Sequence, residues 1–125
     1  MAYITDSALD AAIAYLVTNA EELWIISGAS DPADYAAALA AKLGEKLAPT
    51  LSAPQNGASN GRRTVVSAIT DGEVTATGTA TRWVLVKTSG TPALLTCQTL
   101  SSSQGVTDNN TFTLGALSVT IPDAA

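Results

Sequence analysis

The sequence predicts an α+β fold in which N-terminal helices pack on a C-terminal antiparallel β-sandwich or barrel. Alanine, a strong helix former, is concentrated in the first half of the 125 residues. Threonine and serine are concentrated in the second half, where turn residues separate short runs of strand formers. A chain of this length favours one shared core. We therefore expect a single domain over 1–125, with a helical part that includes short strands at 1–53 and an antiparallel β part at 62–122.

The first predicted helix covers residues 6–20. Thr5, Asp6 and Ser7 offer side-chain oxygens that can cap its first turn. Asp10 lies three positions after Ser7, the spacing of a capping box. Apolar side chains recur every three or four positions and form one stripe, which is the face expected to be buried. This stripe consists of Leu9, Ile13, Leu16, Val17 and Ala20.

A short strand and a second helix are expected next. Strand formers occupy 23–26. Asp31 can cap a helix, and Pro32 suits its first position, so we expect a helix to begin there. It should continue toward Leu43 and end before Gly44, because glycine commonly follows a helix C-terminus.

The second half is expected to consist of strands joined by turns and loops. Gly72 permits the positive φ of a tight hairpin turn, so a turn is expected at Asp71-Gly72. Before it we expect a mobile loop at 54–61 and a strand at 63–70, and after it a strand at 73–81 with a bulge at Gly78. Farther along we expect a central apolar strand at 82–87, a turn at 89–92, a strand at 93–100, a polar loop at 101–110 and a closing strand at 111–121.

The side chains available for catalysis are few. The chain contains no histidine, which is the commonest general base and the commonest metal ligand. Ser-His and Cys-His nucleophile pairs are therefore impossible within one chain. The single cysteine, Cys97, lies in an apolar run and is expected to be a small buried core residue. We expect a protein that is not an enzyme and that holds no metal and no cofactor.

Pairs of acidic residues have a simpler interpretation than cation binding or catalysis. Asp31 and Asp34 stand where a helix N-terminus favours negative charge, and no third acid follows at calcium-loop spacing. Asp71 and Glu73 flank the predicted turn and are interpreted as solvated turn residues. The polar run at 108–110 resembles half of a calcium-binding loop, but is interpreted as a polar connection.

The charge balance also limits the partners. The formal net charge is −5, with only six basic residues, which disfavours nucleic acid binding. The one basic pair, Arg62-Arg63, is expected to flank a strand or to meet an acidic neighbour. No apolar run reaches the roughly 18 residues of a membrane span, and the N-terminus lacks the pattern of a signal peptide. We therefore expect neither nucleic acid nor membrane as a partner.

Protein partners are favoured instead. Only 14% of the residues are charged, so other subunits are expected to cover part of the apolar surface. Trp24 and Trp83 lie in strand-like runs and are interpreted as core residues or, alternatively, as interface anchors. The threonines at 75, 77, 79 and 81 predict a solvent-facing sheet surface that could pair with another protein. Contacts are expected on the N-terminal arm and first helix, on the 54–61 loop with its arginines, and on the threonine surface. The expected contact residues are Tyr3, Ile4, Arg62, Arg63, Thr75, Thr77, Thr79 and Trp24.

Two long blocks of the sequence resemble a known group of proteins. Residues 61–83 read GRRTVVSAITDGEVTATGTATRW, and residues 100–114 read LSSSQGVTDNNTFTL. Together with the closing Ile121-Pro122, they resemble small virion proteins of tailed bacteriophages, which look like head decoration or cement proteins. Relatives often carry a histidine at or beside Arg82, which this chain lacks, so the resemblance carries over no metal or catalytic residue.

The resemblance implies a non-enzymatic cement protein on the outer surface of a phage head. It would be made in the cytoplasm of the bacterial host, bind the major capsid protein and stabilise contacts between capsid subunits. Symmetric sites on a shell favour small closed oligomers, so we expect self-association as a dimer or trimer. Two alternatives remain open: a phage tail, fibre or head–tail connector protein, and a carbohydrate-binding β-sandwich module with an exposed tryptophan.

Overall fold

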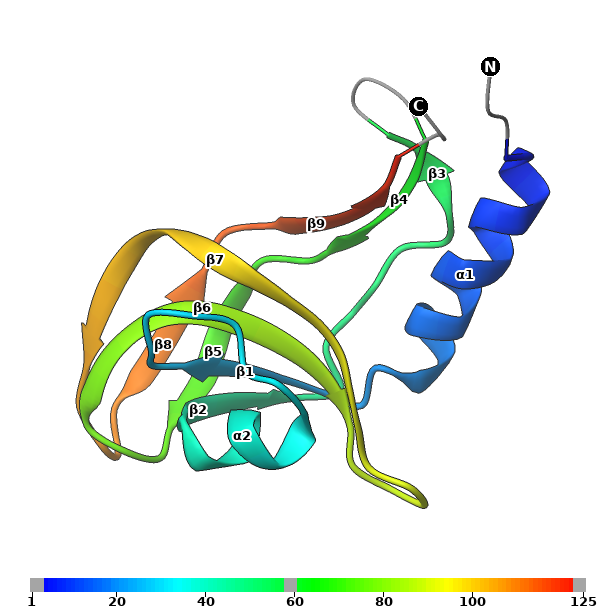
Figure 1. The fold of residues 1–125 in the computed structure, drawn as a ribbon. Coiled ribbons are helices and arrows are strands. Elements are labelled where there is room, and N and C mark those ends of the chain that lie inside the picture. The colour runs from blue at the N-terminus through cyan, green and yellow to red at the C-terminus, as the bar shows by residue number, and fades with distance from the viewer. Residues whose placement is uncertain (1–3, 58–60, 123–125) are drawn as a thin grey trace. The chain divides into compact units, whose positions relative to one another are not determined.

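The computed structural model describes residues 4–57 and 61–122 and has an α+β fold with mainly β content (Figure 1). The α+β prediction is therefore confirmed. The chain forms two compact units, and the smaller one is assembled from three separate segments. The smaller unit comprises Met1–Asn19, Thr50–Ala68 and Gly115–Ala125, and the larger comprises Ala20–Pro49 and Ile69–Leu114. That the two units behave as one domain stays a prediction.

The smaller unit contains one helix and a three-stranded antiparallel sheet. The helix is α1 (Asp6–Asn19), and the strands, in the order β3-β4-β9, are β3 (Gln55–Asn56), β4 (Arg62–Val66) and β9 (Leu117–Ile121). The predicted first helix is confirmed, and the Thr5 hydroxyl accepts a hydrogen bond from the Ala8 N–H at 3.2 Å in its first turn. β4 and β9 pair without a register shift from Arg62↔Ile121 to Val66↔Leu117.

The core of this unit forms where α1 packs against β4. The apolar stripe of the helix is buried at Leu9, Ile13 and Leu16. Val66 and Val119 are buried from the sheet side. Thr64 is also fully buried, and its hydroxyl donates a hydrogen bond to the Ser52 carbonyl at 2.7 Å, which satisfies the polar group.

The larger unit is built on a curled six-stranded antiparallel sheet that resembles half of a barrel (Figure 1). The strand order is β7-β6-β1-β2-β5-β8, so β7 and β8 are its edge strands. In chain order the strands are β1 (Glu22–Ile26), β2 (Lys42–Leu47), β5 (Ile69–Val74), β6 (Gly78–Lys87), β7 (Ala93–Val106) and β8 (Thr111–Leu114). The strands expected at 23–26 and 82–87 are confirmed, and both lie in the sheet interior.

A short helix, α2 (Tyr35–Ala40), covers part of one face of this sheet. Its buried Ala38 packs with Trp24 and Ile26 of β1 and with Val84 and Val86 of β6. Because four successive residues of β1 are buried, the strand has both faces covered.

The second helix is much shorter than expected. It begins after its N-cap Asp34, not at Asp31, and it ends at Ala40. Residues Lys42–Leu47 form β2, where Gly44 pairs with β1 and β5. A Cβ at Gly44 would stand 2.7 Å from the Glu73 carbonyl, so this glycine permits close packing inside the sheet and does not end a helix.

The hairpin turn expected at Asp71-Gly72 does not exist. Both residues lie inside β5, and the predicted strand at 63–70 is divided between β4 and β5, which belong to different sheets. The chain instead turns at 75–77, so the predicted strand at 73–81 is also interrupted. The glycine at 72 is required by the close approach of Phe112, with which it pairs across the β5–β8 ladder.

Two further boundaries differ from the expectation. The first six residues of the predicted polar loop at 101–110 continue β7, because they pair in part with the start of β6. The predicted closing strand is divided into β8 of the larger sheet and β9 of the smaller. Within the loop expected at 54–61, Gln55 and Asn56 form β3, and residues 58–60 lie outside the described part.

Candidate interaction surface

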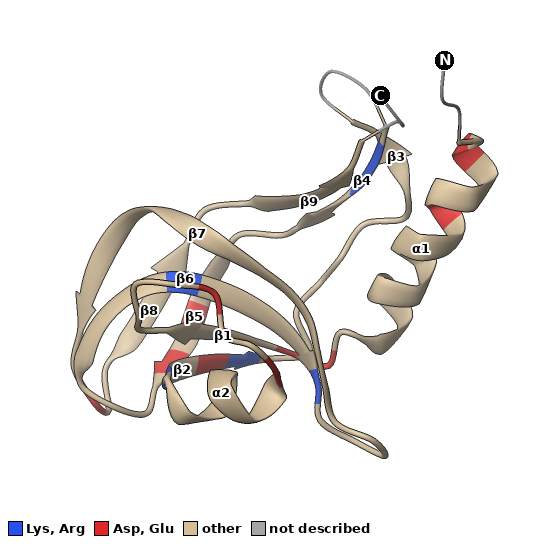
Figure 2. Ribbon diagram, viewed as in Figure 1, with Lys and Arg blue, Asp and Glu red and all other residues tan. Residues whose placement is uncertain are grey.

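The edge strands of both sheets carry no charged side chain. In the described part of the chain the edges are β7 and β8 of the larger sheet and β3 and β9 of the smaller. None of their residues is Asp, Glu, Lys or Arg, and β7 and β9 appear in tan along their length in Figure 2. Soluble proteins commonly place charges on sheet edges to prevent pairing with other chains. This distribution is therefore the reverse of the usual protection.

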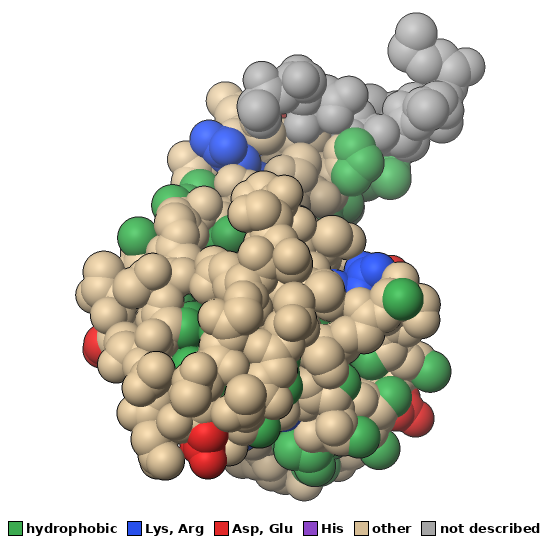
Figure 3. Space-filling view, turned by 90° about the vertical axis from the view of Figure 1, so that its left-hand side faces the viewer, with side chains coloured by type: hydrophobic (Ala, Val, Ile, Leu, Met, Phe, Trp, Pro, Cys, Tyr) green, Lys and Arg blue, Asp and Glu red, His purple; other side chains and the backbone are tan. Residues whose placement is uncertain are grey.

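The charged residues pair with one another instead. Four of the six basic side chains form ion pairs with acids: Lys42 with Glu45, Lys46 with Asp71, Arg62 with Asp10, and Arg82 with Asp31. In the view of Figure 3, backbone and uncharged polar side chains (tan) predominate and few charged side chains appear. A surface of this kind offers hydrogen-bonding groups with little electrostatic selection of partners.

The four edges differ in how regular they are. The pairing of β7 with β6 is interrupted by two bulges. At one, Leu95 has no partner residue on β6; at the other, residues 100–103 of β7 lie opposite Thr81 alone. Such bulges bend an edge and hinder its extension by another strand. β8 is short, and the Gln104 side chain donates a hydrogen bond to its Thr113 carbonyl at 3.4 Å. β3 has two residues, which leaves β9 as the edge with an unbroken five-residue register.

The two predicted contact arginines have different surroundings. Arg62 donates hydrogen bonds to Asp10, at 2.5 Å from Nε, and to the Asn56 side chain at 2.6 Å. The bond to Asp10 raises the pKa of Arg62. The acidic neighbour expected for the pair is confirmed at Arg62, whose guanidinium is engaged within the unit. Arg63 lies opposite Thr120 in the β4–β9 ladder, and its role as a contact residue stays a prediction.

The expected row of threonines does not form on one strand. Thr75 and Thr77 lie in the loop between β5 and β6, and only Thr79 and Thr81 belong to β6. The Thr77 hydroxyl accepts a hydrogen bond from the Asp108 N–H at 3.0 Å, and the Thr81 hydroxyl donates to the Gly28 carbonyl at 2.7 Å. Thr75, Thr77 and Thr79 are exposed, so a contact role at these three positions stays a prediction.

Neither tryptophan reaches the surface. Trp24 is 1% exposed and Trp83 is 2% exposed, so the proposed interface role of Trp24 is wrong and the core interpretation is correct. The Trp24 ring packs beside Tyr35, with the Lys42 ammonium 4.7 Å from its centroid. The carbohydrate-binding alternative required an exposed tryptophan, and it is not proposed further.

The N-terminal contact residues are only partly described. Ile4 is 40% exposed, as a contact residue requires, and Tyr3 lies outside the described residues. On α1 the large exposed apolar side chain is Tyr15.

A small polar cluster links the loop before α2 to the sheet. Arg82 donates hydrogen bonds to Asp31 at 2.5 Å, to Thr99 at 3.0 Å and to the Ala29 carbonyl at 3.1 Å. Cys97 was expected to be buried, but it is only half-buried. Its Sγ lies 3.6 Å from Oδ1 of Asp31. Burial, together with the negative charge of Asp31, raises the pKa of the Cys97 thiol, which makes it a poor nucleophile.

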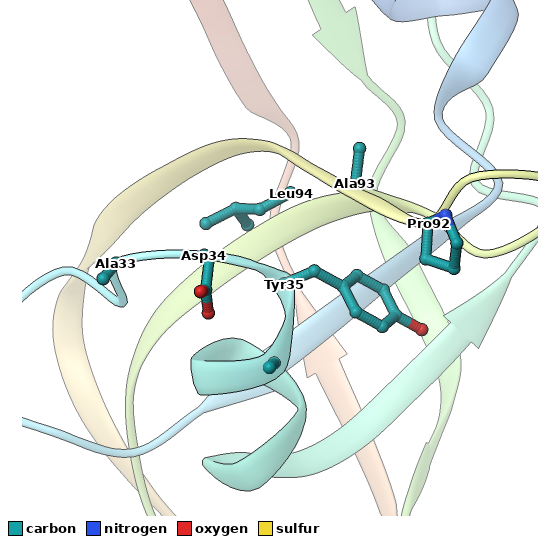
Figure 4. A pocket seen from close by; sticks show the side chains of 7 residues that line it. Ala33, Asp34, Tyr35, Pro92, Ala93 and Leu94 are labelled. Atoms are coloured by element: carbon teal, nitrogen blue, oxygen red, sulfur yellow. The ribbon is translucent and has the colours of Figure 1, made fainter.

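One shallow pocket of about 600 Å³ lies between α2 and the start of β7 (Figure 4). It is lined by Ala33, Asp34, Tyr35, Ala36, Pro92, Ala93 and Leu94. Asp34 is the charged member of this lining, and it accepts a hydrogen bond from the Ala37 N–H as the cap of α2. The pocket brings together no nucleophile and general base, and it lies at one end of the β7 edge.

Two other kinds of site are absent from the described residues. Within 4–57 and 61–122, no three His, Cys, Asp or Glu side chains gather where they could hold a metal ion. In the same ranges, no helix is long and apolar enough to cross a membrane.

No family model, curated protein or solved structure matches this chain. One feature of the sequence does point to this surface: residues 88–107 include no charged residue. The meaning of that stretch depends on knowing that it supplies an edge strand.

Proposed function

We propose that this protein is a non-enzymatic decoration (cement) protein that binds the outer surface of a tailed-phage head and strengthens contacts between major capsid protein subunits. The observation that supports this proposal is the absence of charge from all four edge strands in the described residues. Uncharged edges and exposed hydroxyl groups suit contact with other polypeptides, since main-chain groups at an edge can pair with another chain. The resemblance of two sequence blocks to virion proteins supplies the partner.

A cement role also fits the scarcity of reactive groups. Cys97 has a raised pKa, and the arginine and lysine side chains described above are largely engaged in ion pairs. A cement protein needs an interface and no reaction centre. An interface of about 1,200 Å², repeated over many copies, is sufficient to stiffen a shell.

The direct test is co-sedimentation of the full chain with capsids of the phage that encodes it, prepared without this protein. We expect saturable binding that changes little when the salt concentration is raised, because uncharged surfaces are not screened. Absence of binding at every salt concentration would count decisively against the proposal. Copy number in complete particles separates head from tail: hundreds of copies support cement, and about a dozen or fewer support the tail or connector alternative.

A pair of variants tests the contribution of the β7 edge. Ser103→Glu adds a charge to an exposed position of β7, and Ala53→Glu adds the same charge to an exposed loop. We expect the first to weaken capsid binding and the second to leave it unchanged, because a carboxylate buried in a contact with another polypeptide loses its hydration. Equal binding by both variants would remove the β7 edge from the contact surface.

A further inference from the structure

Among the four described edges, β9 alone combines an uncharged sequence with an unbroken five-residue ladder. It pairs with β4 over five residues without a bulge, and its sequence Leu-Ser-Val-Thr-Ile is rich in strand formers. No strand of the described residues pairs along its other side. An edge of this kind is a template for an additional antiparallel strand.

The sequence of β9 is compatible with a second copy of itself as that strand. Apolar and polar residues alternate symmetrically about Val119. If two copies of β9 pair antiparallel about a twofold axis at Val119, Leu117 faces Ile121 of the second copy. Val119 then faces Val119 of the second copy. Ser118 faces Thr120 of the second copy, so apolar residues meet apolar ones and polar residues meet polar ones.

The faces of the sheet agree with this arrangement. Thr64 and Val66 pair with Val119 and Leu117, so the apolar residues of β9 lie on the same face as the buried residues of β4. Leu117 and Ile121 remain only half-buried in the single chain, whereas Val119 is buried. A second β9 would cover these two side chains and extend the apolar face across the twofold axis.

Charge favours the same partner. The chain has a formal net charge of −5, so two copies repel each other unless the surfaces that meet are uncharged. Residues 109–122 contain no charged side chain, and an antiparallel β9 pair therefore meets no like charge within the strands.

We propose that two copies of this chain associate through β9 and form a continuous six-stranded antiparallel sheet in the order β3-β4-β9-β9-β4-β3. This interface is isologous and closed, as expected for a twofold dimer. The inference extends the proposed function without depending on it, because the dimer can form whether or not the protein binds capsids.

The first experiment measures the mass of the full chain by sedimentation equilibrium over a range of concentrations. We expect a reversible dimer of the 12.6-kDa chain. Thr120→Glu is expected to raise the dissociation constant about tenfold or more, because it places two like charges on neighbouring positions across the axis. Within one chain the new carboxylate faces Arg63, so the thermal midpoint should not fall. Ser103→Glu adds the same charge on β7 and should leave the dimer intact.

A second experiment tests the register without weakening the interface. In a Cys97→Ser background, Val119→Cys places two thiols opposite each other on the axis, at a Cα separation of about 4.5–5.5 Å that a disulfide can span. Thr120→Cys is the matched control, since its two copies are diagonal neighbours. We expect oxidised dimer from the first variant and little from the second.

Three outcomes would overturn the inference. They are a wild-type chain that stays monomeric at all concentrations, a dimer that Thr120→Glu leaves unchanged, and the absence of a Val119→Cys cross-link in a folded protein. A monomer that nevertheless binds capsids would overturn the dimer and leave the proposed function standing. A dimer that does not bind capsids would leave this inference standing and contradict the proposed function.

Discussion

The ring of Phe112 lies against the backbone of Gly72, so closely that a Cβ at position 72 would overlap the ring. The two residues are paired in the β5–β8 ladder of the larger unit. Gly44 of the neighbouring β2 approaches the same ring, where a Cβ would stand 3.1 Å from its Cδ1 atom. Two glycines in adjacent strands therefore make space for one buried aromatic side chain.

Gly72→Ala should destabilise the fold by about 1–3 kcal/mol, because the added methyl group overpacks a close contact. Urea unfolding followed by circular dichroism measures this loss. Gly105→Ala is the control, since a Cβ at that position would meet no atom within 4 Å, and it should change stability by less than about 0.5 kcal/mol. In a Phe112→Leu background the cost of Gly72→Ala should shrink, and an equal cost in both backgrounds would contradict the contact.

Asp34→Ala should remove the N-cap of α2 at a cost of about 1 kcal/mol. The Asp34 carboxylate accepts a hydrogen bond from the Ala37 N–H at 2.9 Å, so hydrogen exchange at that amide should accelerate. Asp34→Ser should retain most of the protection, because serine also caps helices. Asp31→Ala is the decisive comparison: it should release Arg82 but leave the Ala37 amide protected. Equal exposure of that amide in both alanine variants would refute the assignment.

Glu21→Gln should remove a pH-dependent part of the stability. The Glu21 carboxylate accepts hydrogen bonds from the backbone N–H of Ser89 at 3.0 Å, from the Ser89 hydroxyl at 2.8 Å and from the Thr88 N–H at 3.0 Å. These bonds, led by those from Ser89, lower the pKa of Glu21 below its ordinary 4.5. A lowered folded-state pKa adds stability above the unfolded value, and that stability is lost as the pH falls through the folded value.

Wild type should therefore exceed Glu21→Gln in thermal stability at neutral pH, and the difference should shrink as the pH falls below about 4.5. Thermal midpoints measured at closely spaced pH values give this comparison. Glu73→Gln is the control, because it neutralises an exposed carboxylate elsewhere in the same unit. A difference that grows on acidification would show that the Glu21 bonds do not favour the charged form.

Cys97 should react slowly with thiol reagents at pH 8. Burial raises its pKa above the ordinary 9.0, and Asp31 contributes in the same direction, so little thiolate is present. The rate of modification by a disulfide reagent should be severalfold below that of free cysteine. Asp31→Asn should increase this rate at constant pH, because a negative charge beside the thiol is removed. A rate equal to that of free cysteine in the native wild type would contradict both the burial and the pKa shift.

Local sequence patterns were sufficient for the elements whose signals lie within a few residues. The stripe of Leu9, Ile13 and Leu16 identified α1, and the apolar run of β1 identified a buried strand. The same reasoning failed at Gly44 and Gly72, since glycine has the same local signature at a helix end, in a turn and under an aromatic ring. For Asp31 and Asp34, either residue could cap a helix, and the decision came from Arg82, a residue distant in sequence.

The sequence by itself determined the α+β class, the lack of histidine and the low charge, because these follow from composition and from periodicity within one element. Only the tertiary structure decided which strands are edges, because strand neighbours are set by pairing between residues far apart in the chain. The same uncharged run is an ordinary interior strand in one topology and an open edge in another. The proposed contact with a capsid and the β9 dimer both depend on that distinction.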